Sequence, residues 1–306
     1  MSLGVLNNLS AVYAENNLDN TNNSLSKTLQ QLSSGSKINS GADDAAGLSI
    51  VDGLQANQQA LNQSQTNAQE GVGLLQVADG ALSQVTSLLN RAVTLATEAS
   101  NGTLTLTQSA AADQEYQSIL SEIGNIGSTT TYNGTAVFST TAVDIYTGDS
   151  TATGASIDAL SIDALSSTSV GDTGGAMAYT PGSKTATATI SYSASAGQDL
   201  TGTLTGTTVA KAQTAAQTVL TNLNAAITDV AAQDGYVGAQ INTLNSASSV
   251  LTTQQENVES AQNAVQATDY ASATSAMSKY EILSQTGISA LAQANSVQQE
   301  VTKLLQ

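Results

Sequence analysis

The chain contains no cysteine and no histidine among its 306 residues. Disulfide bonds, thiolate chemistry and metal sites built from these two residue types are therefore excluded. The Ser/His and Cys/His arrangements of nucleophilic enzymes cannot form either. No phosphate-binding G-x-x-x-x-G-K-[ST] loop occurs, and Gly71-Val72-Gly73 does not complete a G-x-G-x-x-G fingerprint. These absences argue against an enzyme and predict neither a cofactor nor a metal.

Basic residues are also scarce, with 7 Lys and Arg against 24 Asp and Glu, for a net charge of −17. Binding to nucleic acid or to an anionic membrane needs clustered positive charge, so neither partner is expected. No apolar run reaches the roughly 18 residues of a membrane span. The first residues also lack the basic and apolar regions of a secretory signal. By these rules alone the chain would be assigned to the cytoplasm.

Aromatic residues make up 3% of the chain and charged residues 10%, whereas an average soluble domain is roughly a quarter charged. Pro181 is the only proline, so little interrupts long helices. Small and straight side chains suit thin helical bundles, in which helix backbones approach closely. The composition therefore favours a mainly α protein.

A seven-residue apolar repeat is the clearest pattern in the first third of the chain. Its larger members are Leu54, Leu61, Leu75, Leu82 and Leu89. A sustained heptad keeps one helix face against a partner helix. The helix is expected to begin in a capping box from Ser40 to Asp43 and to end at Asn101-Gly102. Asp43-Asp44, the one conspicuous carboxylate pair, is interpreted as helix capping, because neighbouring side chains on a helix diverge.

A second heptad lies near the other end of the chain. Its members are Val237, Leu244, Leu251, Val258 and Val265. One helix is expected over about 208–268, with a bend allowed at Gly235 and Gly238, and a shorter helix near 110–126. The two heptads predict an antiparallel, coiled-coil-like rod. Both chain ends are also amphipathic, through Leu18, Leu25, Leu29 and Leu32 at the front and Ile288, Leu291, Val297, Val301 and Leu304 at the back.

The middle of the chain differs from both ends. Tyr132-Asn133-Gly134-Thr135 predicts a β-hairpin, since Asn-Gly between β-prone residues is its strongest short signal. Residues 139–206 are rich in Thr, Ser and Gly, and Ala186 to Ala194 alternate like a strand. A small, β-containing outer domain is predicted here. Disorder is the alternative.

Several motifs together resemble the terminal signatures of bacterial flagellin. The N-terminal one is LSSGSKINSGADDAAGL at residues 32–48, followed by Asn67-Ala68-Gln69-Glu70-Gly71-Val72 and the Tyr132-Asn133-Gly134 turn. The C-terminal one comprises Asp269-Tyr270-Ala271, Met277-Ser278-Lys279 and Leu291-Ala292-Gln293-Ala294-Asn295. The resemblance covers about residues 1–138 and 208–306, and it is specific because two signatures occur in the family's order.

The resemblance implies a structural subunit of the flagellar filament, exported unfolded through the flagellar type III apparatus without a cleaved signal peptide. That replaces the cytoplasmic assignment with an extracellular one. Residues 1–35 and 270–306 would form the inner tube, 36–138 and 208–269 the surrounding rod, and 139–207 the exposed surface. The implied partners are other copies of the chain, an export chaperone, the filament cap and the hook-junction proteins.

The resemblance also implies candidate contacts for the Toll-like receptor that detects flagellin. The family positions match Arg91, Leu95 and Glu115. The family's Leu-Gln-Arg-Val-Arg-Glu-Leu stretch reads LNRAVTL at residues 89–95 here, so a second arginine and its acidic neighbour are missing.

Three alternatives stay open at this point. A hook–filament junction protein would share similar helical ends. The insert could carry a catalytic site built from Asp, Glu, Ser, Thr, Tyr and Lys, or it could bind a glycan. Its Ser and Thr residues could also carry O-linked sugars.

Overall fold

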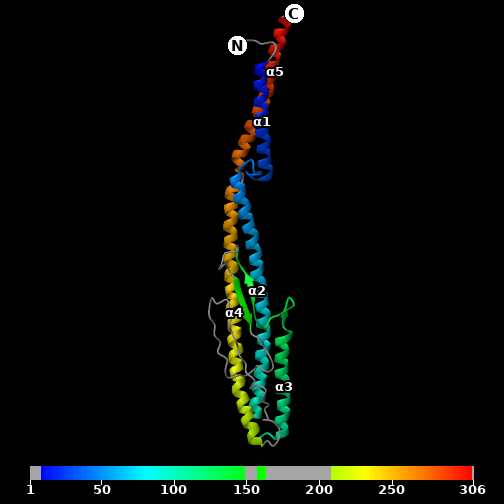
Figure 1. Cartoon of the computed structure of the whole chain (residues 1–306), viewed down its shortest axis with the longest axis vertical. Coiled ribbons are helices and arrows are strands. Elements are labelled where there is room, and N and C mark those ends of the chain that lie inside the picture. Colours follow the sequence, from blue (N-terminus) through cyan, green and yellow to red (C-terminus); the bar gives the residue numbers. More distant parts are fainter. Residues whose placement is uncertain (1–7, 149–156, 163–207, 305–306) are drawn as a thin grey trace. The chain divides into compact units, whose positions relative to one another are not determined.

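The computed structural model describes residues 8–148, 157–162 and 208–304 of the chain (Figure 1). Five helices and four short strands occur in these ranges. They are α1 (Leu9–Ser34), α2 (Ala45–Ala99), α3 (Leu106–Thr129), β1 (Thr131–Tyr132), β2 (Thr135–Ala136), β3 (Ser139–Tyr146), β4 (Ile157–Ile162), α4 (Val209–Gln266) and α5 (Tyr270–Leu304). The predicted class, mainly α with a small β insert, is confirmed.

Packing divides the chain into two compact units. Unit 1 comprises residues 1–58 and 256–306, and unit 2 comprises residues 59–255. Helices α2 and α4 contribute to both units. The limits expected from the resemblance, at 35/36 and 269/270, concern layers of a filament and stay a prediction.

Helices α2 and α4 form the core of unit 2 and run in opposite directions. The side chain of Gln255 donates to Asn62 at 2.8 Å, whereas a Cβ at Gly102 would lie 3.5 Å from Gln213. Between these points, apolar side chains of both helices are fully buried. They include Leu75, Leu82, Leu89, Val219, Leu223, Val230 and Leu244. The predicted heptad rod is confirmed for this part of the chain.

Helix α4 runs without interruption through Gly235 and Gly238. A Cβ at either glycine would meet nothing within 4 Å, so neither marks a close contact. Helix α2 contains a stretch long and apolar enough to cross a membrane by length and composition alone. Its buried heptad face explains this hydrophobicity as part of the rod core.

Two carboxylates face each other across the rod, Asp79 from α2 and Asp234 from α4. Burial, a hydrogen bond to Asp79 and the charge of Asp79 raise the pKa of Asp234 above its usual value. A carboxyl group with a raised folded-state pKa stabilises the fold at low pH, and this contribution is lost as the pH rises through that pKa.

We therefore expect Asp234→Asn to stabilise unit 2 at neutral pH relative to the unmodified chain. The gain should shrink as the pH is lowered through the raised pKa of Asp234, because the native carboxyl group then becomes protonated. Urea unfolding at a series of pH values measures the stabilisation and its dependence on pH. A stabilisation of the same size at every pH would contradict a raised pKa of Asp234.

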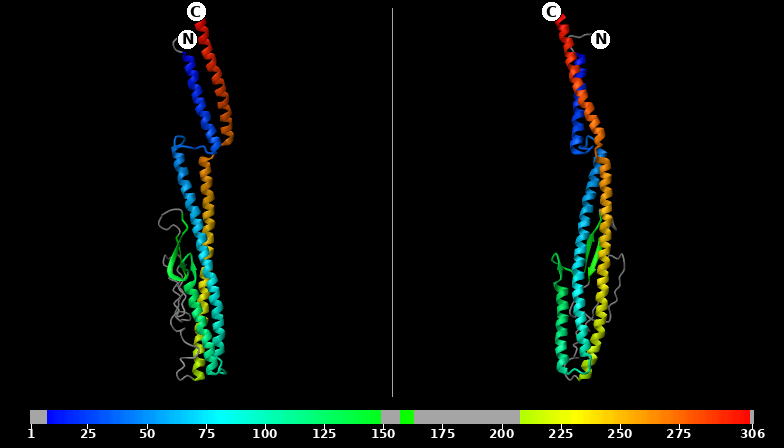
Figure 2. Two further views of the ribbon diagram at one scale, coloured as in Figure 1. Left: turned by 90° about the vertical axis from the view of Figure 1, so that its right-hand side faces the viewer. Right: turned by 180° about the vertical axis from the view of Figure 1, so that it is seen from behind.

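Helix α3 is bound to the rod by one apolar face. Thr105 begins it with a capping box, accepting from the Gln108 N–H while the Gln108 side chain accepts from the Thr105 N–H at 2.9 Å. The buried face consists of Tyr116, Ile119, Leu120 and Ile123. The shorter helix predicted over 110–126 is confirmed and extends further at both ends, alongside α2 in Figure 2.

The predicted hairpin follows α3 directly. Strands β1 and β2 pair antiparallel, with Tyr132 opposite Thr135 and only Asn133 and Gly134 between them. Both turn residues have positive φ, 50° and 79°. These values are typical of the type I′ turn that Asn-Gly favours.

The β insert is anchored on α2. Strands β3 and β4 pair antiparallel, with Tyr146 opposite Ile157. The Asn67 side chain donates to the Tyr146 carbonyl at 2.9 Å, and the buried Ser64 hydroxyl donates to the Gly148 carbonyl at 2.5 Å. The β character predicted for the insert is thus observed in β3 and β4, while the strand expected at 186–194 lies outside the described residues.

Unit 1 contains α1 and α5, which lie side by side (Figure 1). A short antiparallel bridge joins the segments that follow α1 and α4. The Lys37 N–H donates to the Gln266 carbonyl at 2.7 Å, and the Thr268 N–H donates to the Gly35 carbonyl at 3.1 Å. Gly35 has a φ of 71°, which ends α1 in a left-handed cap.

The capping box expected at the start of α2 is wrong by one turn. The helix begins at Ala45, and Asp44 caps it by accepting from the Gly47 N–H at 2.9 Å. Asp43 instead accepts from the Ser40 N–H in the preceding turn and from Lys27 at 2.7 Å. The hydrogen bond from Lys27 is the main cause that lowers the pKa of Asp43 to about 2.

Candidate assembly surface

The heptad side chains are buried to different degrees in the two units. Those in unit 2 are at most 5% exposed: Leu61, Leu75, Leu82, Leu89, Leu244 and Leu251. Those in unit 1, Leu54, Val258 and Val265, are only partly buried. The same sequence pattern thus has a complete partner surface in unit 2 and an incomplete one in unit 1.

Helices α1 and α5 bury even less. Thr28 is the one buried residue of α1 in the described range. Large apolar side chains stand exposed on both helices instead. They are Leu9, Val12, Tyr13 and Leu29 on α1, and Tyr270, Ile282, Leu283, Ile288 and Val297 on α5. Leu9 and Ile282 are each 63% exposed, which leaves substantial apolar area without cover from the same chain.

The amphipathic ends predicted from the sequence are helical, but their predicted apolar side chains are covered only in part. Leu18, Leu25, Leu32 and Leu291 are partly buried, whereas Leu29, Ile288 and Val297 are exposed. The structure does not describe the side chains of Val301 and Leu304.

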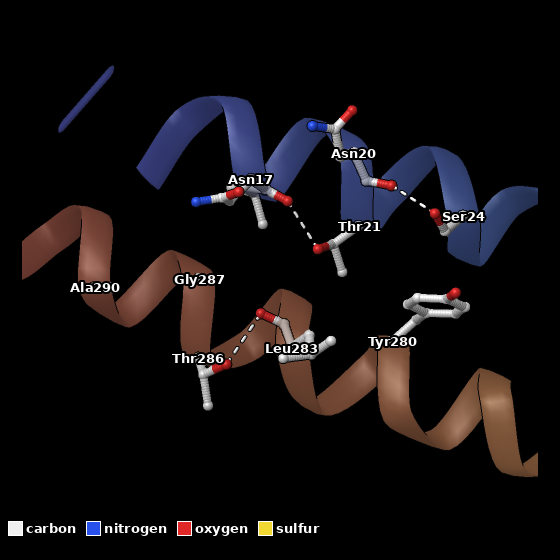
Figure 3. Close-up of a pocket in the computed structure, with 10 residues that line it drawn as sticks. Asn17, Asn20, Thr21, Ser24, Tyr280, Leu283, Thr286, Gly287 and Ala290 are labelled. Atoms are coloured by element: carbon white, nitrogen blue, oxygen red, sulfur yellow. Dashed lines mark hydrogen bonds between the residues drawn. The ribbon is translucent and has the colours of Figure 1, made fainter. Parts of the chain in front are cut away.

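An open groove runs between α1 and α5 (Figure 3). Leu18 and Tyr280 line it, and at Gly287 an added Cβ would lie 3.2 Å from the Leu18 methyl group. The hydroxyls of Thr21 and Ser24 point back to their own helix, where they donate to the Asn17 and Asn20 carbonyls at 2.7 and 2.8 Å. These two hydroxyl groups are therefore bonded to their own helix and are not directed at a small ligand.

No group of three or more acidic side chains that could hold a metal ion occurs in the described part of the chain. The titratable groups with shifted pKa values do not gather in this groove. Its geometry is suited to packing against another protein surface and shows no arrangement of an acid, a base and a nucleophile.

Two family models match this chain. That of the bacterial flagellin N-terminal helical region matches residues 5–142, and that of the C-terminal helical region matches residues 220–305. A flagellin of Halalkalibacterium halodurans is 30% identical over 97% of this chain and 98% of its own length. The chain belongs to the bacterial flagellin family.

Other flagellin-family relatives agree with this assignment. The flagellar filament 33 kDa core protein of Treponema phagedenis is 27% identical over 97% of this chain and 98% of its own length. Polar flagellin C of Vibrio parahaemolyticus is 37% identical over 44% of this chain and 35% of its own length. These matches confirm the resemblance seen in the sequence. This flagellin-family chain is a structural filament subunit, and nothing favours the hook-junction alternative.

The receptor-contact candidates of the flagellin chain occupy two environments. Arg91 on α2 and Glu115 on α3 form an ion pair at 2.7 Å, with side chains 54% and 47% exposed. The hydrogen bond between them raises the pKa of Arg91 and lowers that of Glu115. Leu95, in contrast, is 3% exposed and belongs to the rod core. Of the three candidates, only Arg91 and Glu115 are accessible to a partner in the single chain.

Sequence reasoning missed some of the residues that matter in this flagellin fold. Ser64 and Asn67 anchor the β insert; Asn67 belongs to a motif of the family, but the sequence predicted this role for neither residue. Ile282 and Tyr13 are exposed apolar residues outside the predicted stripes. A helical-wheel comparison that includes every large apolar residue of the two ends would have found them.

Proposed function

We propose that this chain polymerises through unit 1, where α1 and α5 supply the surface that neighbouring copies cover. The observation that supports the proposal is the contrast between the units. Unit 2 buries its heptad side chains completely, whereas α1 buries only Thr28 among its described residues. A helical pair with so little buried apolar area gains little stability from its own packing.

The missing burial would come from other copies. Identical subunits that meet through two different surfaces build an open helical filament when the rotation does not close. The ends of the free chain would be poorly ordered and would fold as neighbours bind them. Polymerisation and the final folding of unit 1 would then be one process.

The layer assignment forms part of this proposal. Residues 1–35 and 270–306 would line the filament, 36–138 and 208–269 would surround them, and 139–207 would face the solvent. We propose an extracellular filament subunit without catalytic function. Its expected partners are the export apparatus with its chaperone, the filament cap and the hook-junction proteins, as in the family.

Seeded polymerisation tests the proposal. Purified chain mixed with short filament fragments should elongate them, and brief proteolysis beforehand should remove both ends, leave unit 2 folded and stop elongation. Electron microscopy and sedimentation measure the filaments, and mass spectrometry identifies the cuts. If the trimmed chain elongates seeds as fast as the intact chain, unit 1 does not carry assembly.

A second proposal concerns the Toll-like receptor. Arg91 and Glu115 are exposed and lie on adjacent helices, where one partner surface could contact both. We expect Arg91→Ala to reduce receptor signalling by the monomer without changing its thermal unfolding, because the ion pair is exposed to solvent. A reporter-cell assay measures the signal. An unchanged dose response would exclude the pair as the contact.

A further inference from the structure

The chain contains the tripeptide Asn-Gly-Thr twice, at residues 101–103 and 133–135. Asn-Gly is the sequence most prone to deamidation, because glycine has no Cβ to hinder the reaction. The glycine nitrogen bonds to the asparagine Cγ, the Cγ–Nδ2 bond breaks, and ammonia leaves with a proton from the glycine amide. Water then opens the cyclic imide to aspartate or isoaspartate. The two identical tripeptides should react equally in an unfolded chain.

The backbone of Asn133 opposes this reaction. With φ values of 50° and 79°, Asn133 and Gly134 are held in the type I′ turn of the hairpin, so ring closure at Asn133 would require its backbone to rotate. Rotation into a reactive geometry would break the Tyr132–Thr135 pairing. It would also disturb Val137, which is buried and donates to the Thr130 carbonyl at 3.1 Å.

Asn101 has no such constraint. It lies two residues beyond the end of α2 and is exposed, and its φ is not among the positive values of the described residues. Across the described part of the chain, no hydrogen bond engages its side-chain amide or the Gly102 N–H. Its own backbone makes two turn bonds, to the Glu98 carbonyl at 3.1 Å and from the Leu104 N–H at 3.3 Å. Local opening of the exposed connection between α2 and α3 would release both bonds.

We infer that Asn101 is a site of spontaneous deamidation in the folded protein, whereas Asn133 is protected by its turn. The product would place a carboxylate three residues from Glu98 at the exposed connection between α2 and α3. An isoaspartate would also lengthen the backbone by one carbon inside the turn that leads to the Thr105 cap of α3.

The experiment follows both sites in the same molecule. Full-length chain is held at mildly alkaline pH and mild temperature, and mass spectrometry quantifies aspartate and isoaspartate in each peptide over time. We expect conversion at Asn101 to be at least about fivefold faster than at Asn133, because the reaction at Asn133 must first break the Tyr132–Thr135 pairing. This ratio corresponds to on the order of 1 kcal/mol of activation free energy. In urea the two rates should become equal.

Gly102→Ala is the matched control variant. A Cβ at this position would meet the Gln213 side chain at 3.5–3.7 Å, an ordinary contact, so the variant should fold normally. It should slow conversion at Asn101 and leave Asn133 unchanged. Equal rates in the folded chain, faster conversion at Asn133, or reaction at both sites only in urea would each overturn the inference.

Discussion

Replacing Leu82 by alanine should lower the free energy of unfolding of unit 2 by about 3 kcal/mol. Leu82 is 1% exposed in the middle of α2 and belongs to the core that α2 shares with α3 and α4. Removing its side chain loses apolar burial and leaves a cavity that packed helices cannot fully close. Urea unfolding of the monomer, followed by far-ultraviolet circular dichroism, measures the change.

Leu54→Ala is the matched control for this prediction. Leu54 has the same residue type, helix and heptad position, but lies in unit 1 and is only partly buried. In the monomer its replacement should cost less than about 1 kcal/mol. Equal costs at the two positions would contradict the contrast in packing between the units.

Replacing both Ile282 and Ile288 by asparagine should raise the critical concentration for polymerisation about 10- to 100-fold. The two side chains are 63% and 57% exposed on α5, so the single chain does not use them for packing. If neighbouring copies cover them, each loses on the order of 1 kcal/mol of burial when it becomes polar. Sedimentation of seeded filaments at a series of protein concentrations gives the critical concentration.

Two substitutions on the same helix serve as the control for that pair. Gln285 and Ser289 are exposed on α5 close to the two isoleucines, and asparagine in their places adds the same residue type without removing apolar surface. This double variant should polymerise like the unmodified chain. Both double variants should leave the urea unfolding of the monomer unchanged. A monomer destabilised by the isoleucine changes would show that these side chains pack within the chain.

The heptads predicted the rod because burial of a period-3.5 stripe is a local property of each helix. Leu82 and Leu244 are therefore buried where the pattern places them. The same pattern cannot state which surface covers a stripe, so Leu54 and Val258 satisfied it equally and remain partly exposed. Burial at the chain ends depends on other molecules, which a single-chain pattern does not contain.

The start of α2 shows a different limit of sequence reasoning. Ser40 and Asp43 have the spacing of a capping box, and Asp43 does accept from the Ser40 N–H. The next residue, Asp44, competes for the role of N-cap and takes it. Asp43 is then free to pair with Lys27, a contact between segments that local spacing does not predict.

Two ion pairs of the described part of the chain, Lys27–Asp43 and Arg91–Glu115, have solvent-exposed basic side chains. Apolar stripes, rather than charges, therefore hold the rod together, and moderate ionic strength should change its folding little. Copies that each carry a net charge of −17 repel one another until counterions screen them. Dissolved salt thus acts mainly on the association of subunits. A wide range of salt concentrations should therefore leave the folding stability of each subunit almost unchanged.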